Sequence, residues 1–175
     1  MLHTNLPSSA NEEMALLLLD IVKSTDIVQQ AGDSAFIERV QRLHRNVRGH
    51  RRSGEIRFLK CTGDGFLAVF RDVEAAVDVA REVGIREREE NTQLRLVIHR
   101  GRVKTGPDGD PLGLEVHRLF RLEAVRDANL PEHGRILISR PAVEALDRGA
   151  REHFEPIGTF HLEGFEKPEE LWVEK

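Results

Sequence analysis

The stretch EIRFLKCTGDGFLAVF, residues 55–70, predicts two short strands joined by a tight turn. Residues 55–60 and 66–70 are rich in bulky apolar side chains, and the TGDG sequence at 62–65 has the glycine and aspartate chemistry of a hairpin turn. The segments on either side of this hairpin indicate the sheet to which it belongs.

An apolar run upstream of the hairpin predicts a buried strand that is followed by a helix. Residues 15–22 are apolar except for Asp20, as expected for a short strand that is covered on both faces. Beyond Asp33, which is a plausible N-cap, apolar residues recur at helical spacing from Phe36 to Val47. We therefore expect a strand and a helix before the hairpin.

The segments downstream of the hairpin complete a βαββαβ unit. Asp72 can cap a helix with an apolar face over 73–83, and residues 94–99 form the next expected strand. This order is that of the ferredoxin-like fold, an α+β architecture in which the first and third strands pair antiparallel in the middle of the sheet. We therefore expect Asp20 and Asp64 to lie together at one edge, although 44 residues separate them.

The remainder of the chain predicts a C-terminal extension of this core. We expect a helix over residues 114–129, a strand over 135–139 and a short helix that starts at Pro141. A final hairpin is expected from strands over 154–161 and 170–173. We interpret residues 14–175 as one domain and the polar residues 1–13 as a flexible leader.

Composition and charge exclude several classes of protein. The single cysteine, Cys61, excludes an intrachain disulfide framework and a cysteine-rich zinc site; we interpret Cys61 as a core residue and His99, at a strand end, as structural. The net charge of −4 disfavours a nucleic-acid binder, and the basic stretch at 44–52 is typical of a solvated helix end. The longest apolar run, residues 14–19, is too short to span a membrane, and no secretory signal is present, so we expect a cytoplasmic protein.

Asp20 and Asp64 are candidate ligands for a divalent cation. Mg²⁺ prefers oxygen ligands and is often bound together with the phosphates of a nucleotide. Gly63 and Gly65 leave room for a phosphate to approach the backbone. The turn alone leaves a second interpretation open, in which Asp64 is only a turn residue. Asp20 ends an apolar strand, where an unpaired carboxylate is costly.

Five stretches of the chain resemble the class III nucleotidyl cyclase catalytic domain, in the order and spacing of that family. They are LDIVKST at 19–25, KCTGDGFLAVF at 60–70, LRLVIHRGRV at 94–103, GLEVHRLFRLE at 113–123 and GRILIS at 134–139. The resemblance covers about residues 14–174 and implies the ferredoxin-like fold of that family. It also implies an enzyme that converts a nucleoside triphosphate into a 3′,5′-cyclic nucleotide and pyrophosphate.

The resemblance implies roles for individual positions. Asp20 and Asp64, with the backbone carbonyl of Ile21, match the ligands of two Mg²⁺ or Mn²⁺ ions. Lys60 and Asp110 match the positions that recognise the base, and both favour ATP.

A further match implies that the site is shared between two chains. Arg121 matches the arginine that stabilises negative charge in the transition state. In the family, this arginine and the base-recognition residues face the metal ligands across a homodimer interface, so the resemblance implies a homodimer.

Several positions depart from the family pattern. His117 replaces an asparagine that orients the ribose, and a neutral imidazole can also donate or accept a hydrogen bond. Leu119 and Phe120 replace small alanines, which predicts a bulkier helix surface beside the substrate. Glu163 stands where the family has a lysine for the triphosphate, and Lys167 is the candidate replacement.

Three alternatives to an ATP cyclase stay open. Stand-alone domains of this size resemble the bacterial pyrimidine cyclases of anti-phage signalling, which make cyclic CMP or cyclic UMP. A pseudo-cyclase would bind nucleotide and dimerise without turnover, although Asp20, Asp64 and Arg121 are retained. A palm-type polymerase or dinucleotide cyclase shares the split βαβ unit, but Lys60, Asp110 and Arg121 at cyclase spacing disfavour it.

Overall fold

The computed structural model describes residues 12–106, 109–126 and 134–175 of the chain. Its strands are β1 (Glu12–Ile21), β2 (Ile56–Cys61), β3 (Gly65–Phe70), β4 (Leu94–Thr105), β5 (Pro111–Leu112), β6 (Ile136–Ser139), β7 (Phe154–Phe160) and β8 (Glu169–Glu174). Its helices are α1 (Ser24–Arg48), α2 (Val73–Glu89), α3 (Leu114–Glu123), α4 (Arg140–Val143) and α5 (Arg148–Arg151). None of the helices in these described ranges is both long enough and apolar enough to cross a membrane.

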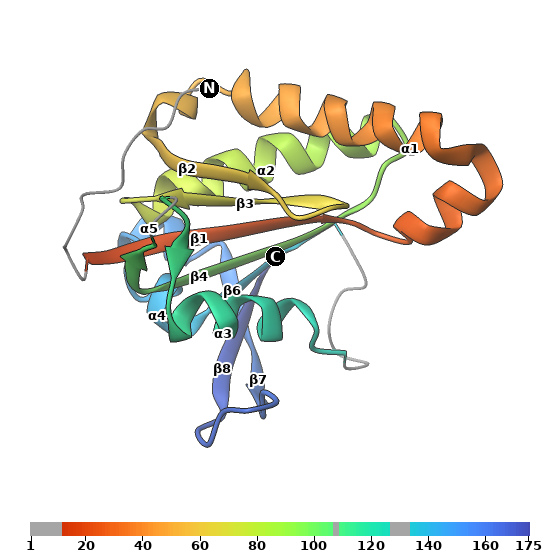
Figure 1. Ribbon diagram of the computed structural model, residues 1–175. Coiled ribbons are helices and arrows are strands. Elements are labelled where there is room, and N and C mark those ends of the chain that lie inside the picture. Colours follow the sequence, from red (N-terminus) through yellow and green to blue (C-terminus); the bar gives the residue numbers. More distant parts are fainter. Residues whose placement is uncertain (1–11, 107–108, 127–133) are drawn as a thin grey trace.

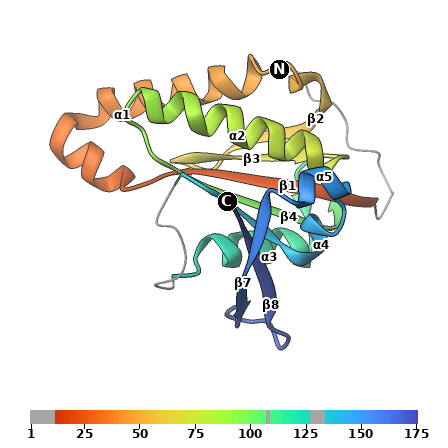
Figure 2. The ribbon, with the colours of Figure 1, turned by 180° about the vertical axis from the view of Figure 1, so that it is seen from behind.

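The strands form one mixed sheet with helices on both faces. Their order is β2-β3-β1-β4-β6-β8-β7, and β5 pairs with β4. Figures 1 and 2 show α1 and α2 on one face of the sheet and α3 on the opposite face. β1 lies between β3 and β4 and runs antiparallel to both. The predicted ferredoxin-like α+β core is therefore confirmed, and β6, β8 and β7 extend it beyond β4.

The apolar run of β1 is buried on both faces, as its sequence predicted. Leu17 and Leu19 pack into the core under α1 and α2, whereas Leu16 and Leu18 pack into the core under α3. These side chains are at most 3% exposed. Burying a leucine contributes roughly 1.5–3 kcal/mol relative to leaving it exposed. This strand therefore anchors both layers and fixes the position of the polar residue that follows the leucines.

Two glycines shape the turn between β2 and β3. Gly65 pairs with Asp20, and a Cβ atom at Gly65 would lie 1.9 Å from the carbonyl oxygen of Leu19. This distance excludes every side chain, so the close approach of β3 and β1 explains that glycine. Gly63 has a φ of +110°, a conformation that glycine adopts without steric cost. Together the two glycines hold the turn against the end of β1.

α1 begins earlier than its sequence predicted. It starts at Ser24 and runs to Arg48, with a break at Gly32, where φ is 82° and ψ is 167°. The part beyond the break corresponds to the predicted helix. The part before the break was missed because it offers few apolar residues to reveal a helical period. Ile37, on the predicted apolar face, is 51% exposed and therefore does not belong to the core.

Two other predicted boundaries differ from the structure or lie outside it. β1 includes Glu12 and Glu13, which the sequence placed in the leader. The helix expected over 114–129 ends at Glu123, so that prediction was too long. Residues 127–129, like residues 1–11 of the leader, lie outside the described part of the chain.

Side chains at the end of the basic stretch at 44–52 lie beside carboxylates of α2. Arg52 Nη1 lies 3.0 Å from Asp78 Oδ2, and His50 Nε2 lies 2.9 Å from Glu82 Oε2. Both carboxylates belong to α2, and His50 is only 2% exposed. The residues that follow α1 therefore pack partly against α2, which differs from the expected solvated helix end.

Lys23, between β1 and α1, has a left-handed backbone with φ 56° and ψ 38°. A left-handed residue with a Cβ atom costs roughly 1–2 kcal/mol. We expect Lys23→Gly to raise the free energy of unfolding by about 1 kcal/mol, because glycine removes that cost but also adds freedom to the unfolded chain. Urea denaturation measures the change. Asn91→Gly, at φ 55°, is the matched control and should gain less, because asparagine tolerates this conformation better than lysine. A less stable Lys23→Gly variant would contradict the prediction.

Candidate active site

The structure brings Asp20 and Asp64 together at the end of β1. The backbone amide of Ile21 donates to the carbonyl oxygen of Asp64 at 3.0 Å, which joins the strand end to the β2–β3 turn. Burial raises the pKa of Asp20 to about 7, and the charge and hydrogen bond of Asp64 add to this effect. Glu123 raises the pKa further, whereas Arg95 opposes the rise. The raised pKa shows that Arg95 does not offset the effects of burial, Asp64 and Glu123 on Asp20.

Three residues that sequence reasoning missed surround this pair. Ser24 Oγ donates to Asp64 Oδ2 at 2.7 Å, at the first residue of α1. Arg95 Nη1 lies 3.7 Å from Asp20 Oδ2 and also forms an ion pair with Glu123 of α3. Arg95 is the register partner of Asp20 in the β1–β4 pair. Only the strand register, which the sequence does not state, would have revealed this contact.

Lys60 and Asp110 form an ion pair between the end of β2 and the segment before β5. Fifty residues separate them in the sequence. Their side chains are 55% and 34% exposed, so both remain accessible to a ligand. The structure thus brings together the two residues expected to recognise a base, and that role stays a prediction.

α3 carries the other expected catalytic residues on its outer face. His117 and Arg121 are exposed and lie one helical turn apart. Arg121 Nη1 lies 3.3 Å from Glu163 Oε2 in the β7–β8 loop. Leu119 is fully buried, so the expectation that it adds bulk to the outer surface is wrong, whereas Phe120 is 39% exposed. The helical period explains the difference, because Leu119 faces the sheet.

Comparisons with known proteins decide the fold family. No protein-family model matches the chain, and no curated protein matches it. An adenylate cyclase from Trypanosoma brucei in its monomeric state has a TM-score of 0.79 at 20% identity, with 97% of this chain and 92% of that chain covered. The guanylate cyclase domain of a Catenaria anguillulae protein, in complex with GTP, has a TM-score of 0.76 at 18% identity, with 94% and 98% covered. The chain has the class III nucleotidyl cyclase fold.

A bacterial protein shares this cyclase fold. An adenylate/guanylate cyclase/hydrolase from Silicibacter pomeroyi has a TM-score of 0.71 at 24% identity, with 93% of this chain and 96% of that chain covered. The cyclase fold predicted from the sequence motifs is therefore confirmed across nearly the whole chain. Identities of this size show the fold and leave the activity to chemical reasoning.

The acidic pair of this cyclase fold suits a hard divalent cation. A cation that replaces the proton on Asp20 would remove the repulsion between Asp20 and Asp64. Ile21 lies at the same strand end and offers a backbone carbonyl oxygen. Within the described residues no cluster of three or more His, Cys, Asp or Glu side chains is suited to hold a metal. Mg²⁺ is usually bound by one or two carboxylates and keeps water or substrate oxygens as its other ligands.

The expected site residues do not all gather in one chain of the cyclase fold. Figure 1 shows the loop between β7 and β8 projecting from the α3 side of the sheet, away from the junction of β1 and α1. That loop carries Glu163 and Lys167, and Lys167 is exposed. Arg121 pairs with this loop rather than with the acidic pair. The expected site residues therefore form separate clusters in this structure.

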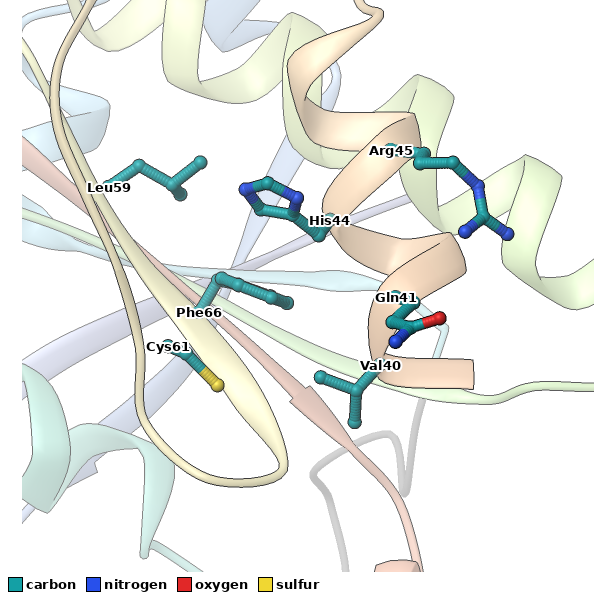
Figure 3. A pocket seen from close by; sticks show the side chains of 7 residues that line it. All are labelled: Val40, Gln41, His44, Arg45, Leu59, Cys61 and Phe66. Carbon is teal, nitrogen blue, oxygen red and sulfur yellow. The ribbon is translucent and has the colours of Figure 1, made fainter. Parts of the chain in front are cut away.

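A pocket of about 440 Å³ lies behind the β2–β3 hairpin, on the side of α1 (Figure 3). Its lining residues are Val40, Gln41, His44, Arg45, Leu59, Cys61 and Phe66. The His44 ring lies 5.4 Å from the Phe66 ring, and burial together with the charge of Arg48 lowers the pKa of His44. Cys61 is exposed in this pocket, so its interpretation as a core residue is wrong. Side chains alternate along a strand, which places Cys61 on the face of β2 opposite Lys60.

Proposed function

We propose that this protein is a nucleotidyl cyclase that converts a nucleoside triphosphate, with ATP favoured, into a 3′,5′-cyclic nucleotide and pyrophosphate. The observation that carries the proposal is the coupled pair of Asp20 and Asp64, at the end of β1, in a fold shared with adenylate and guanylate cyclases. In the reaction, the ribose 3′-oxygen forms a bond to the α-phosphorus, the bond from the α-phosphorus to the bridging oxygen of pyrophosphate breaks, and the 3′-hydroxyl proton passes to solvent water.

The acidic pair and its neighbours would hold two Mg²⁺ or Mn²⁺ ions. When bound, such ions lower the pKa of the 3′-hydroxyl and neutralise the triphosphate. Asp20 and Asp64 supply carboxylate oxygens, and Ile21 supplies its carbonyl oxygen. Ser24 orients the Asp64 carboxylate through its 2.7 Å hydrogen bond. Arg95 holds Asp20 from the neighbouring strand.

The remaining groups would act on the ribose and the phosphates. We propose that Arg121 donates hydrogen bonds to the charge that develops on the α-phosphate, a contribution typically worth about 2.7–4 kcal/mol of barrier for one such donor. His117, one turn away on the same exposed face of α3, would orient the ribose. Lys167 would contact the triphosphate from the β7–β8 loop.

We propose that Lys60 and Asp110 recognise the base of the nucleotide. Together they offer one donor and one acceptor, which complements the ring nitrogen and the amino group of adenine. Cytosine also places an amino group beside a ring nitrogen, so the pair also fits CTP, and a pyrimidine triphosphate, CTP or UTP, is the alternative substrate. That alternative corresponds to the pyrimidine cyclases of anti-phage signalling.

We propose that the working unit is a homodimer. β5 and α3 carry three exposed large apolar side chains: Leu112 is 50%, Leu114 60% and Phe120 39% exposed. Exposed apolar groups of this kind suit a protein interface. We propose that a second copy of the chain covers these side chains and completes the site with its own Arg121.

A second candidate function is a nucleotide-binding module without turnover. The ion pair between Arg121 and Glu163 favours it, because a carboxylate then partly neutralises the proposed catalytic arginine. The pair is largely exposed, at 48% and 83%, and such exposed pairs typically contribute at most about 1 kcal/mol. A bound triphosphate can therefore displace Glu163, which leaves the cyclase as the favoured function.

The deciding experiment is incubation with Mg²⁺ or Mn²⁺ and each of ATP, GTP, CTP and UTP, followed by mass spectrometry of the products. We expect cyclic AMP from ATP, and Asp64→Ala should abolish it without unfolding the protein. Cyclic CMP or cyclic UMP would select the pyrimidine alternative. If the folded protein makes no cyclic product, the cyclase function is wrong. Thermal stabilisation by a nucleotide without any product would then support the nucleotide-binding module.

A further inference from the structure

A buried histidine connects α3 to the centre of the sheet. His99 of β4 has a side chain that is only 1% exposed. Its Nδ1 atom lies 2.7 Å from Ser139 Oγ of β6, and its Nε2 atom lies 2.7 Å from Glu115 Oε2 in the first turn of α3. Contacts at both ring nitrogens fix the orientation of the ring. The Glu115 carboxylate is therefore held at one place above the sheet.

The same carboxylate is part of a longer network. Arg118 Nε donates to Glu115 Oε2 at 3.0 Å, and Arg118 Nη1 donates to Glu169 Oε2 of β8 at 3.0 Å. The guanidinium carbon of Arg118 also lies 4.3 Å from the centre of the Phe165 ring. Two residues one turn apart on α3 thus attach the helix directly to β4 and β8, and His99 connects this network to β6.

Close packing adds a steric constraint to this network. A Cβ atom at Gly101 would lie 2.4 Å from Glu115 Cγ, so the side chain of Glu115 rests directly on the backbone of β4. Contact this close leaves α3 little freedom to move towards the sheet or along it. The hydrogen bonds and the packing together define the distance of α3 from the sheet and its rotation about the helix axis.

The anchored face and the proposed catalytic face belong to one short helix. Leu119 and Leu122 are buried on the face of α3 that packs against the sheet, whereas His117 and Arg121 lie on the exposed face. A rotation of α3 that released Glu115 would therefore displace His117 and Arg121 together.

We propose that His99 and Glu115 are positioning residues, which act through α3 to place Arg121 and His117 for the reaction. This inference rests on the proposed cyclase function. The competing interpretation is that His99 is only a satisfied polar group of the core. The two differ in what a mutation does to the chemical step when the fold is kept.

The test compares Glu115→Ala with a matched control at Glu87. Glu87 is fully buried, binds Arg42 and Asn46, and connects α1 to α2 on the opposite face of the sheet. We expect Glu115→Ala to lower kcat by at least about tenfold, because small displacements of catalytic groups are costly, and to leave KM within about twofold. Glu115→Gln keeps an oxygen that can accept from His99 and should retain most of kcat. Glu87→Ala should reduce thermal stability and leave kcat within about twofold.

A double-mutant cycle separates positioning from general destabilisation. If Glu115 acts by placing Arg121, Glu115→Ala should cost little in a chain that already carries Arg121→Ala. Equal costs in both backgrounds would overturn the inference, as would an unchanged kcat in Glu115→Ala. If Glu115→Ala does not fold, His99→Gln takes its place, and equal costs of His99→Gln with and without Arg121→Ala would overturn the inference. A wild-type protein without turnover would contradict the proposed cyclase function itself. An active wild type with an unaffected Glu115→Ala variant would contradict only the positioning role.

Discussion

Asp20→Asn is expected to abolish turnover and, at pH 7, to make the metal-free protein more stable. The pKa of Asp20 is about 7 in the folded protein, against an ordinary value of 3.8. Between these values the folded protein keeps a proton that the unfolded chain releases, so stability falls as the pH rises through this window. Asparagine cannot ionise and removes that loss. We expect a gain of roughly 2 kcal/mol, less than the whole pKa difference implies, because the carboxylates of Asp20 and Asp64 are coupled.

Thermal melts of chelator-treated protein at pH 5 and pH 8 measure this effect. The melting temperature of the wild type should fall from pH 5 to pH 8 by more than that of Asp20→Asn. Mg²⁺ should raise the melting temperature of the wild type and leave the variant nearly unchanged, since a ligand of the folded state stabilises it. Asp26→Asn, at an exposed carboxylate in the first turn of α1, is the control and should show no gain. An Asp20→Asn protein that melts below the wild type at pH 8 would show that the carboxylates do not repel each other.

Two inactive variants are expected to regain activity when they share a dimer. Asp64→Ala removes a proposed metal ligand, and Arg121→Ala removes a proposed donor that should be worth about 100- to 1,000-fold in kcat. If Asp64 and Arg121 of opposite chains form each site, a mixed dimer has one intact site. In a two-fold symmetric dimer at random mixing, half of the dimers are mixed, so we expect about a quarter of the wild-type activity.

Co-expression of the two variants with different affinity tags, followed by purification through both tags, isolates the mixed dimer. Its activity should reach about half that of the wild type, because one of two sites is intact. Each variant alone serves as the control. Activity of the mixed dimer no higher than that of the variants alone would show that Asp64 and Arg121 act within one chain.

Much of the fold was predictable because its signals are local. The apolar run of β1, the glycine turn at 62–65 and the N-cap at Asp72 each predicted an element that the structure contains. Asp72 accepts a hydrogen bond from the Glu74 amide, as expected of a cap. The first part of α1, before Gly32, escaped prediction because few apolar residues mark it.

The acidic pair of the candidate site was predictable from the sequence, whereas the side chains that contact this pair were not. The proximity of Asp20 and Asp64 followed from the strand order alone. The contacts of Ser24 and Arg95 did not, because they depend on where α1 starts and on the register of β1 against β4. The exposure of Cys61 likewise depends on how far α1 covers the edge strand β2.

The sequence by itself therefore determined the order of elements, the βαββαβ core and the presence of an acidic pair beside a glycine turn. Those properties arise from side-chain periodicity and turn chemistry, which neighbouring residues dictate. Only the tertiary structure decided that burial and Asp64 raise the pKa of Asp20, that Arg121 lies beside Glu163, and that His99 contacts Glu115. These contacts join residues far apart in the chain. Their distances depend on strand register and helix placement, which many weak packing interactions set together.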